Sequence, residues 1–174
     1  HREYLSSLYK LLEIEKADVS TVSFVRFDDN DVLPTIAPRS PLKLFETGVD
    51  AVESMLYQQG FIDNSPCAKL YASRLFDTCR FNEGILYEDL ATIPRVICGA
   101  KKVATTTTPM YFYRRRNTSI TGTFTLKRCD VLDVVDELEA YMKQNHSRLV
   151  DAALSRKFSA NMNMLWLMTI TGVK

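Results

Sequence analysis

The chain of 174 residues contains little glycine, proline and histidine, and its charges almost cancel. Six glycines and six prolines exclude a collagen-like or low-complexity protein. Lys and Arg number 22 against 21 Asp and Glu, which argues against a protein that binds phosphate backbones, because such proteins carry a basic excess. No apolar run approaches the ~20 residues that would span a bilayer. The composition therefore predicts one globular domain, which at this length buries roughly 70% of its unfolded surface.

Nucleotide-binding motifs are also absent. The sequence has no G-x-G-x-x-G, no Walker A motif and no glycine-rich turn between a strand and a helix. It therefore lacks a nucleotide-binding half of the usual kind. The chain starts at His1 rather than at a methionine, and we expect a processed or truncated piece of a longer protein.

Cysteine and histidine are too few and too scattered for a zinc site. The cysteines lie 12, 19 and 31 residues apart without a C-x-x-C pair, and His1 and His146 are the only imidazoles. A domain with this apolar content does not need disulfides. We therefore expect a cytoplasmic protein with four reduced thiols, at Cys67, Cys79, Cys98 and Cys129.

The spacing of apolar and β-branched residues predicts a mixture of helices and strands. Helices are expected at Tyr4–Glu15, Gly48–Gln59, Glu88–Cys98 and Asp130–Asn145, followed by a final helix from Ser147 through Trp166. Strands are expected at Val19–Phe27, Lys101–Thr106 and Met110–Arg114. The proline-rich connection Leu33–Leu44 holds at most one edge strand, and the loop-rich centre Asn64–Gly84 holds one short helix at Ala72–Asp77.

Two of these helices carry apolar stripes at the spacing of one helix face. In the first helix the stripe consists of Leu5, Leu8, Tyr9 and Leu12. In the helix over residues 130–145 it consists of Val131, Val134, Val135, Leu138 and Met142. We expect both stripes to face the core, in an α/β or α+β domain.

An acidic segment leads into the third predicted helix. It places Glu88 and Asp89 at the expected N-terminus, shortly after Gly84. Exposed amides and the helix dipole keep a carboxylate ionised at this position. An ionised carboxylate at the lip of a pocket takes the proton of an attacking hydroxyl. From the residues alone, an acidic helix cap and a catalytic base are both open.

Short motifs between residues 66 and 120 succeed one another in a specific order. They are Pro66-Cys67-Ala68-Lys69-Leu70-Tyr71, Arg74-Leu75-Phe76, Phe81, Glu83-Gly84, Tyr87-Glu88-Asp89, Ala100-Lys101-Lys102-Val103 and Pro109-Met110-Tyr111-Phe112-Tyr113-Arg114-x-Arg116-x-x-Ser119-Ile120. In this order they resemble the C-terminal half of the bacterial family 2 glycosyltransferases with the GT-A fold. The segment from His1 to Phe27 resembles the helix and strand after the metal-binding D-x-D of that family, so the resemblance covers about two-thirds of the chain.

The resemblance implies an α/β fold with an incomplete GT-A mixed sheet and flanking helices. Residues 1–125 would form the acceptor-side half of the catalytic domain, and residues 126–174 a helical C-terminal extension. The implied reaction is the inverting transfer of a sugar from a nucleotide-diphosphate donor to a saccharide acceptor, as in cell-envelope polysaccharide biosynthesis. The intact family implies a divalent metal, Mg or Mn, whose ligands would lie outside this chain.

The resemblance also assigns roles to individual residues. Asp89 would be the general base, and Glu88 would position the acceptor or Asp89 itself. The implied substrate-binding residues are Lys69, Tyr87, Arg114 and Arg116. From the residues alone, the arginines can equally form a solvated strand end, and Lys69 can be structural. Pro94 departs from the family pattern: either the helix starts near Glu88 and Pro94 distorts it, or it starts later and moves Asp89.

Three further features bear on metal binding and on partners. Asp29-Asn30-Asp31 matches D-x-D literally, but it comes after a strand, so we interpret it as a turn and assign it no metal. The Trp166 tail predicts a core or interface helix, with peripheral association at the inner face of the membrane as the alternative. A partial sheet leaves open edges that favour self-association into a homo-oligomer. The alternative to an enzyme is a non-catalytic saccharide- or partner-binding module.

Overall fold

The computed structural model describes residues 1–28, 31–32, 41–115 and 124–172. A mixed four-stranded sheet lies at its centre, in the order β2-β4-β1-β3. The strands are β1 (Val19–Phe27), β2 (Leu42–Phe45), β3 (Lys69–Tyr71) and β4 (Val103–Arg114). The two central strands, β1 and β4, are parallel, and each edge strand is antiparallel to its neighbour. The expected α/β class with a mixed sheet is therefore confirmed.

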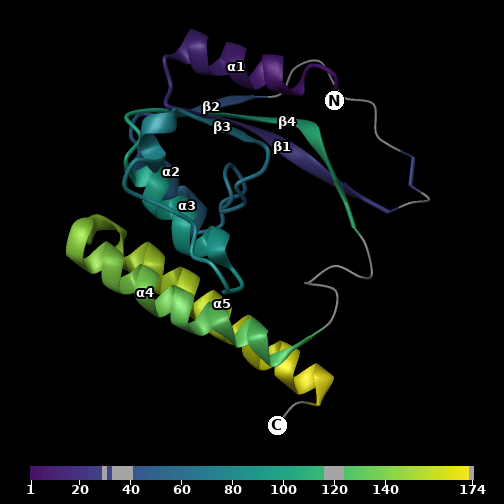
Figure 1. Cartoon of the computed structure of the whole chain (residues 1–174), viewed down its shortest axis with the longest axis vertical. Coiled ribbons are helices and arrows are strands. Elements are labelled where there is room, and N and C mark those ends of the chain that lie inside the picture. Colours follow the sequence, from purple (N-terminus) through teal and green to yellow (C-terminus); the bar gives the residue numbers. More distant parts are fainter. Residues whose placement is uncertain (29–30, 33–40, 116–123, 173–174) are drawn as a thin grey trace.

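Five α-helices surround this sheet in layers (Figure 1). They are α1 (Tyr4–Glu15), α2 (Gly48–Leu56), α3 (Glu88–Cys98), α4 (Asp130–Asn145) and α5 (Val150–Thr171). Helix α1 covers one face of the sheet, α2 and α3 cover the other, and α4 and α5 form an outer layer against them. Short 3-10 turns lie at Ser73–Phe76, Leu126–Cys129 and Ser147–Leu149.

Two apolar clusters hold these layers together. The small cluster lies under α1 and contains Leu8, Val22, Ala68 and Met110. The large one joins the sheet to α2, α3, α4 and α5, and it includes the complete predicted stripe of α4. Its members lie on both sides of residue 125, so one continuous core connects the two predicted parts of the chain.

The predicted α1 stripe is only partly buried. Leu8 is inaccessible to solvent, whereas Leu5 and Tyr9 are 67% and 58% exposed. Helix α1 packs on β1, β3 and β4, and Leu8 is the residue of the stripe that enters the small cluster there. Helix α2 also ends at Leu56, three residues before the predicted end, because Gln58 turns to a left-handed φ of 56°.

The sheet differs from the prediction at two strands. Strand β4 continues through Pro109, where two separate strands were expected. Register shifts between Thr21 and Phe24 of β1 absorb the extra residues of β4 around Pro109, and a bulge is where a strand tolerates a proline. Strand β3 was not predicted, because three residues are too few to show a periodic pattern. Edge strand β2 is the one strand allowed in the proline-rich connection.

Candidate functional site

Helix α3 starts at Glu88, and Asp89 therefore lies in its first turn. The helix continues through Pro94, which is buried, so the proline does not shift the start. The preceding residue, Tyr87, is the last residue of the loop that leads into the helix, and it has a left-handed φ of 64°. The backbone N–H of Leu86 donates to a carboxylate oxygen of Asp130 at 2.9 Å, which ties this approach to α4.

The Asp89 carboxylate is half-buried and accepts two hydrogen bonds. Oδ1 accepts from the backbone N–H of Leu90 at 2.7 Å, and Oδ2 accepts from Nδ2 of Asn64 at 2.9 Å. Burial raises the pKa of Asp89, and the neighbouring charge of Glu88 adds to this, while the two hydrogen bonds lower it in part. Desolvation thus outweighs the stabilisation expected at a helix N-terminus.

Lys69 lies behind this carboxylate, with its side chain 2% exposed. Its ammonium donates to Oδ1 of Asp63 at 2.7 Å, to the carbonyl of Ser65 at 2.7 Å and to that of Cys67 at 3.4 Å. Burial lowers the pKa of Lys69, and the carboxylates of Asp63 and Asp89 offset part of that decrease. Its three donors are engaged within the chain, so Lys69 fixes the 63–67 loop that carries Asn64.

Two arginines from the C-terminal part of the chain approach Asp89 and Tyr87. Burial lowers the pKa of the Arg156 guanidinium on α5, and the charge of Asp89 offsets part of that decrease. Nε of Arg128 donates to the hydroxyl of Tyr87 at 3.3 Å. Sequence reasoning did not assign these arginines or Asn64 to the site. No local spacing could reveal them, because packing of α5, of the 3-10 turn before α4 and of the 63–67 loop brings them there.

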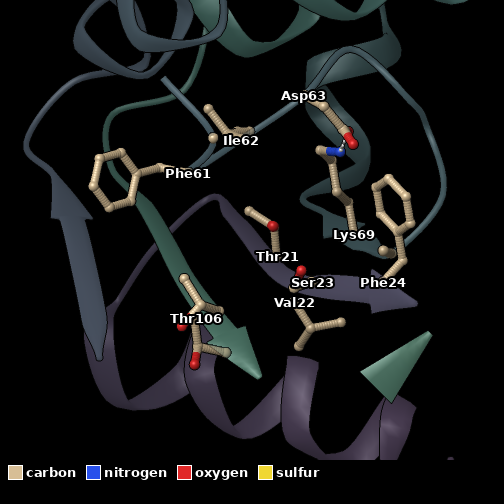
Figure 2. A pocket seen from close by; sticks show the side chains of 12 residues that line it. Thr21, Val22, Ser23, Phe24, Phe61, Ile62, Asp63, Lys69 and Thr106 are labelled. Carbon is tan, nitrogen blue, oxygen red and sulfur yellow. Dashed lines mark hydrogen bonds and ion pairs between the residues drawn. The ribbon is translucent and has the colours of Figure 1, made fainter. Parts of the chain in front are cut away.

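A pocket of about 240 Å³ lies beside the ion pair that Asp63 forms with the buried Lys69. Figure 2 shows this pair on its wall, with the rings of Phe24 and Phe61 on opposite sides. Hydroxyl-bearing residues and apolar residues share the rest of the lining, the former being Thr21, Ser23, Thr106 and Thr107. Asp89 is not part of the lining, but Asn64, the residue after Asp63 in the chain, donates to it.

The remaining predicted residues lie elsewhere or outside the described residues. Arg114 is exposed at the end of β4, in register with Phe27 of β1. Arg116 lies outside the described residues, as do Asp29 and Asn30 of the literal D-x-D. The backbone N–H of Asp31 donates to the carbonyl of Asp28 at 3.0 Å.

The structure brings together Tyr87, Glu88, Asp89 and Lys69, and adds Asn64, Arg128 and Arg156. Within the described residues, no three Asp, Glu, His or Cys side chains gather so that they could hold a metal ion. All four cysteines are free thiols. In the same part of the chain, no helix combines the length and apolarity needed to cross a membrane.

Comparisons with known proteins leave the family open. No protein-family model matches the chain, and a search of curated proteins finds no match either.

Proposed function

We propose that this chain forms the acceptor side of an inverting glycosyltransferase, with Asp89 as the general base. The observation that carries the proposal is the half-buried Asp89 carboxylate in the first turn of α3, oriented by Asn64. Its pKa is raised by burial. A raised pKa brings a carboxylate closer to neutral pH, where it accepts a proton more effectively in the transition state.

The proposed reaction is one in-line displacement at the anomeric carbon of a nucleotide-diphosphate sugar. The acceptor oxygen forms its bond to that carbon while the bond to the diphosphate oxygen breaks, and the acceptor proton passes to Asp89. The diphosphate leaves with the electron pair. The proposal places the ligands of the divalent metal, which would neutralise the leaving diphosphate, outside this chain.

In this proposal one sugar residue of the acceptor occupies the pocket beside Asp63 and Lys69, and the reacting hydroxyl belongs to the next residue, which extends out of that pocket to Asp89. Its hydroxyl-bearing lining suits sugar hydroxyls, and the rings of Phe24 and Phe61 suit the apolar face of a sugar. At about 240 Å³ the pocket is smaller than the ~300–1,000 Å³ of sites for drug-sized ligands. It therefore fits one sugar residue of the acceptor rather than an oligosaccharide. The proposal includes a cytoplasmic location, in keeping with four free thiols.

The test is transfer from a panel of nucleotide sugars, assayed with a protein in which a nucleotide-binding half precedes His1. Removing a general base costs about 10²–10⁴-fold in rate, so Asp89→Asn should lower kcat by that factor. The matched control is Glu83→Gln, an exposed carboxylate in the same approach loop. Its kcat should stay within about twofold.

Two results would contradict the assignment. Near-normal turnover by Asp89→Asn would remove Asp89 as the base. Saccharide binding by the chain with no transfer from any donor would favour the alternative, a non-catalytic saccharide-binding module. The pH profile gives a second readout, because the acid limb of kcat should track the raised pKa of Asp89.

A further inference from the structure

Helix α5 presents a row of large apolar side chains to solvent. Six of them are exposed by 43% to 69%: Leu154, Phe158, Met162, Leu165, Trp166 and Ile170. The helix lies in the outermost layer of the molecule (Figure 1). The number, size and contiguity of these side chains mark an interaction surface, whereas single exposed apolar residues are normal on any protein.

The buried side of α5 is built from smaller residues. Ala152, Ala153 and Ala160 pack inward together with Met164. The helix therefore carries apolar side chains on two sides, the largest of them on the outside, and it also exposes polar residues such as Asn161 and Asn163. A helix of this kind is normally covered on both sides. Packing within the chain covers one side only.

Charge identifies the partner that covers the other side. No charged residue occurs on α5 after Lys157, and Lys157 itself pairs with Asp136 and Glu139 at 2.9 and 2.7 Å. Arg156 is mostly buried near Asp89. Helices that bind membrane surfaces carry Lys and Arg beside their apolar face. The uncharged face of α5 lacks them, and it is complementary to a second copy of itself.

The spacing of the exposed row also suits self-association. Leu154, Phe158, Met162, Trp166 and Ile170 succeed one another at intervals of four residues. They form one ridge of the helix surface, and ridges of this type interdigitate between two helices that cross at about −50°. We propose that α5 is a homodimer interface in which two copies cross near Met162, the middle of the ridge.

The exposed area is sufficient for a stable dimer. The six side chains expose about 700 Å² per copy, taking roughly 200 Å² for one fully exposed large side chain. Two copies would then bury about 1,400 Å², within the ~1,200–2,000 Å² of specific interfaces. This interface is independent of the proposed reaction, and its test does not use activity.

The first experiment measures mass in solution by light scattering and sedimentation over a wide concentration range. The wild-type chain should have the mass of a dimer. The double variant Phe158→Glu/Trp166→Glu should have half that mass, with an unchanged circular dichroism spectrum. The matched control is Leu5→Glu/Ile14→Glu on α1, where the two residues are comparably exposed, at 67% and 75%. The control should remain dimeric, because α1 lies on the opposite face of the sheet (Figure 1).

The second experiment locates the crossing point by disulfide formation. In a Cys67→Ser background, which removes the exposed thiol, Met162→Cys should form a dimer under mild oxidation. Asn163→Cys, one position around the helix, should not. A monomeric wild-type chain at every concentration would overturn the proposal, as would a dimer that survives Phe158→Glu/Trp166→Glu. If the chain is a monomer that binds neutral phosphatidylcholine vesicles, the proposal is wrong, and a membrane surface rather than a second copy covers α5.

Discussion

The body and the first turn of helix α3 lie in contrasting environments. The body is part of the large core, where Leu90, Ile93, Val96 and Ile97 are at most 1% exposed. In the first turn Glu88 is exposed and Asp89 is half-buried. Many apolar contacts from α2 and α4 hold the body. The first turn depends on single directional contacts, such as the hydrogen bond from Asn64 to Asp89.

This difference separates the residues that set stability from those available for chemistry. Apolar contacts are numerous and individually weak, so loss of one side chain lowers stability by a graded amount. When a hydrogen bond to a partly buried carboxylate is lost, no other donor takes its place. The orientation and the pKa of that carboxylate then change together. One helix can therefore be rigid in the core and carry a tunable carboxylate at its end.

The largest effect on stability is expected in the body of α3. Ile97→Ala leaves a cavity at a fully buried position and should lower the free energy of unfolding by about 2–5 kcal/mol. Urea denaturation monitored by circular dichroism measures this loss. The control in the first turn, Glu88→Gln, should change it by less than about 0.5 kcal/mol. Equal losses of stability in the two variants would contradict the distinction between the body and the first turn of α3.

A smaller loss of stability is expected for Lys69→Met, next to the first turn of α3. Removing one partner of a fully buried ion pair costs ~3–5 kcal/mol of stability. The Asp63 carboxylate, however, is 42% exposed, so water can solvate it when Lys69 is removed. The expected loss is therefore about 1–3 kcal/mol. The same denaturation measurement applies, with Lys10→Met on the exposed side of α1 as control. A loss no larger than that of the control would mean that Lys69 does not fix the 63–67 loop.

The core-forming elements were predictable because their signal is local. Helices α1, α3 and α4 begin and end as the spacing predicts, since apolar residues recur with the helical period. Strand β1 has its predicted bounds for the same reason, because it is long and rich in β-branched residues. Pro109 split the predicted strand in two, because a bulge that accommodates proline depends on the neighbouring strand.

The surroundings of Asp89 were not predictable, because distant segments supply them. Asn64 comes from a loop and Arg156 from the last helix, and only tertiary packing brings them to the first turn of α3. The direction of the pKa shift also depends on burial, which the sequence does not show. Similarly, the spacing in α5 predicts an apolar helix, but not that Phe158 and Trp166 lie on its exposed side.

The pH dependence of the free energy of unfolding tests the raised pKa of Asp89. Because its pKa in the folded state is raised, the contribution of Asp89 to stability is complete below the unfolded pKa of roughly 3.9. It is lost as the pH rises through the folded pKa. Relative to Asp89→Asn, the wild type should therefore lose stability across that window. Urea denaturation of both proteins at several pH values measures the difference, and a wild type that gains stability would contradict the sign.

The smallest change in stability is expected where glycine replaces a residue with left-handed backbone. Tyr87, before α3, and Lys16, after α1, both have a left-handed φ, of 64° and 50°. Lys16 caps α1 with an exposed side chain, so Lys16→Gly should relieve the strain and stabilise the chain by about 0.5–1 kcal/mol. Tyr87→Gly relieves the same strain but removes a side chain whose ring packs against the core and whose hydroxyl accepts from Arg128. It should therefore destabilise the chain, and thermal unfolding of the two variants measures the difference in sign. If Tyr87→Gly were stabilising too, the strain at Tyr87 would have no compensating contact, and the ring would not hold the first turn of α3 in place.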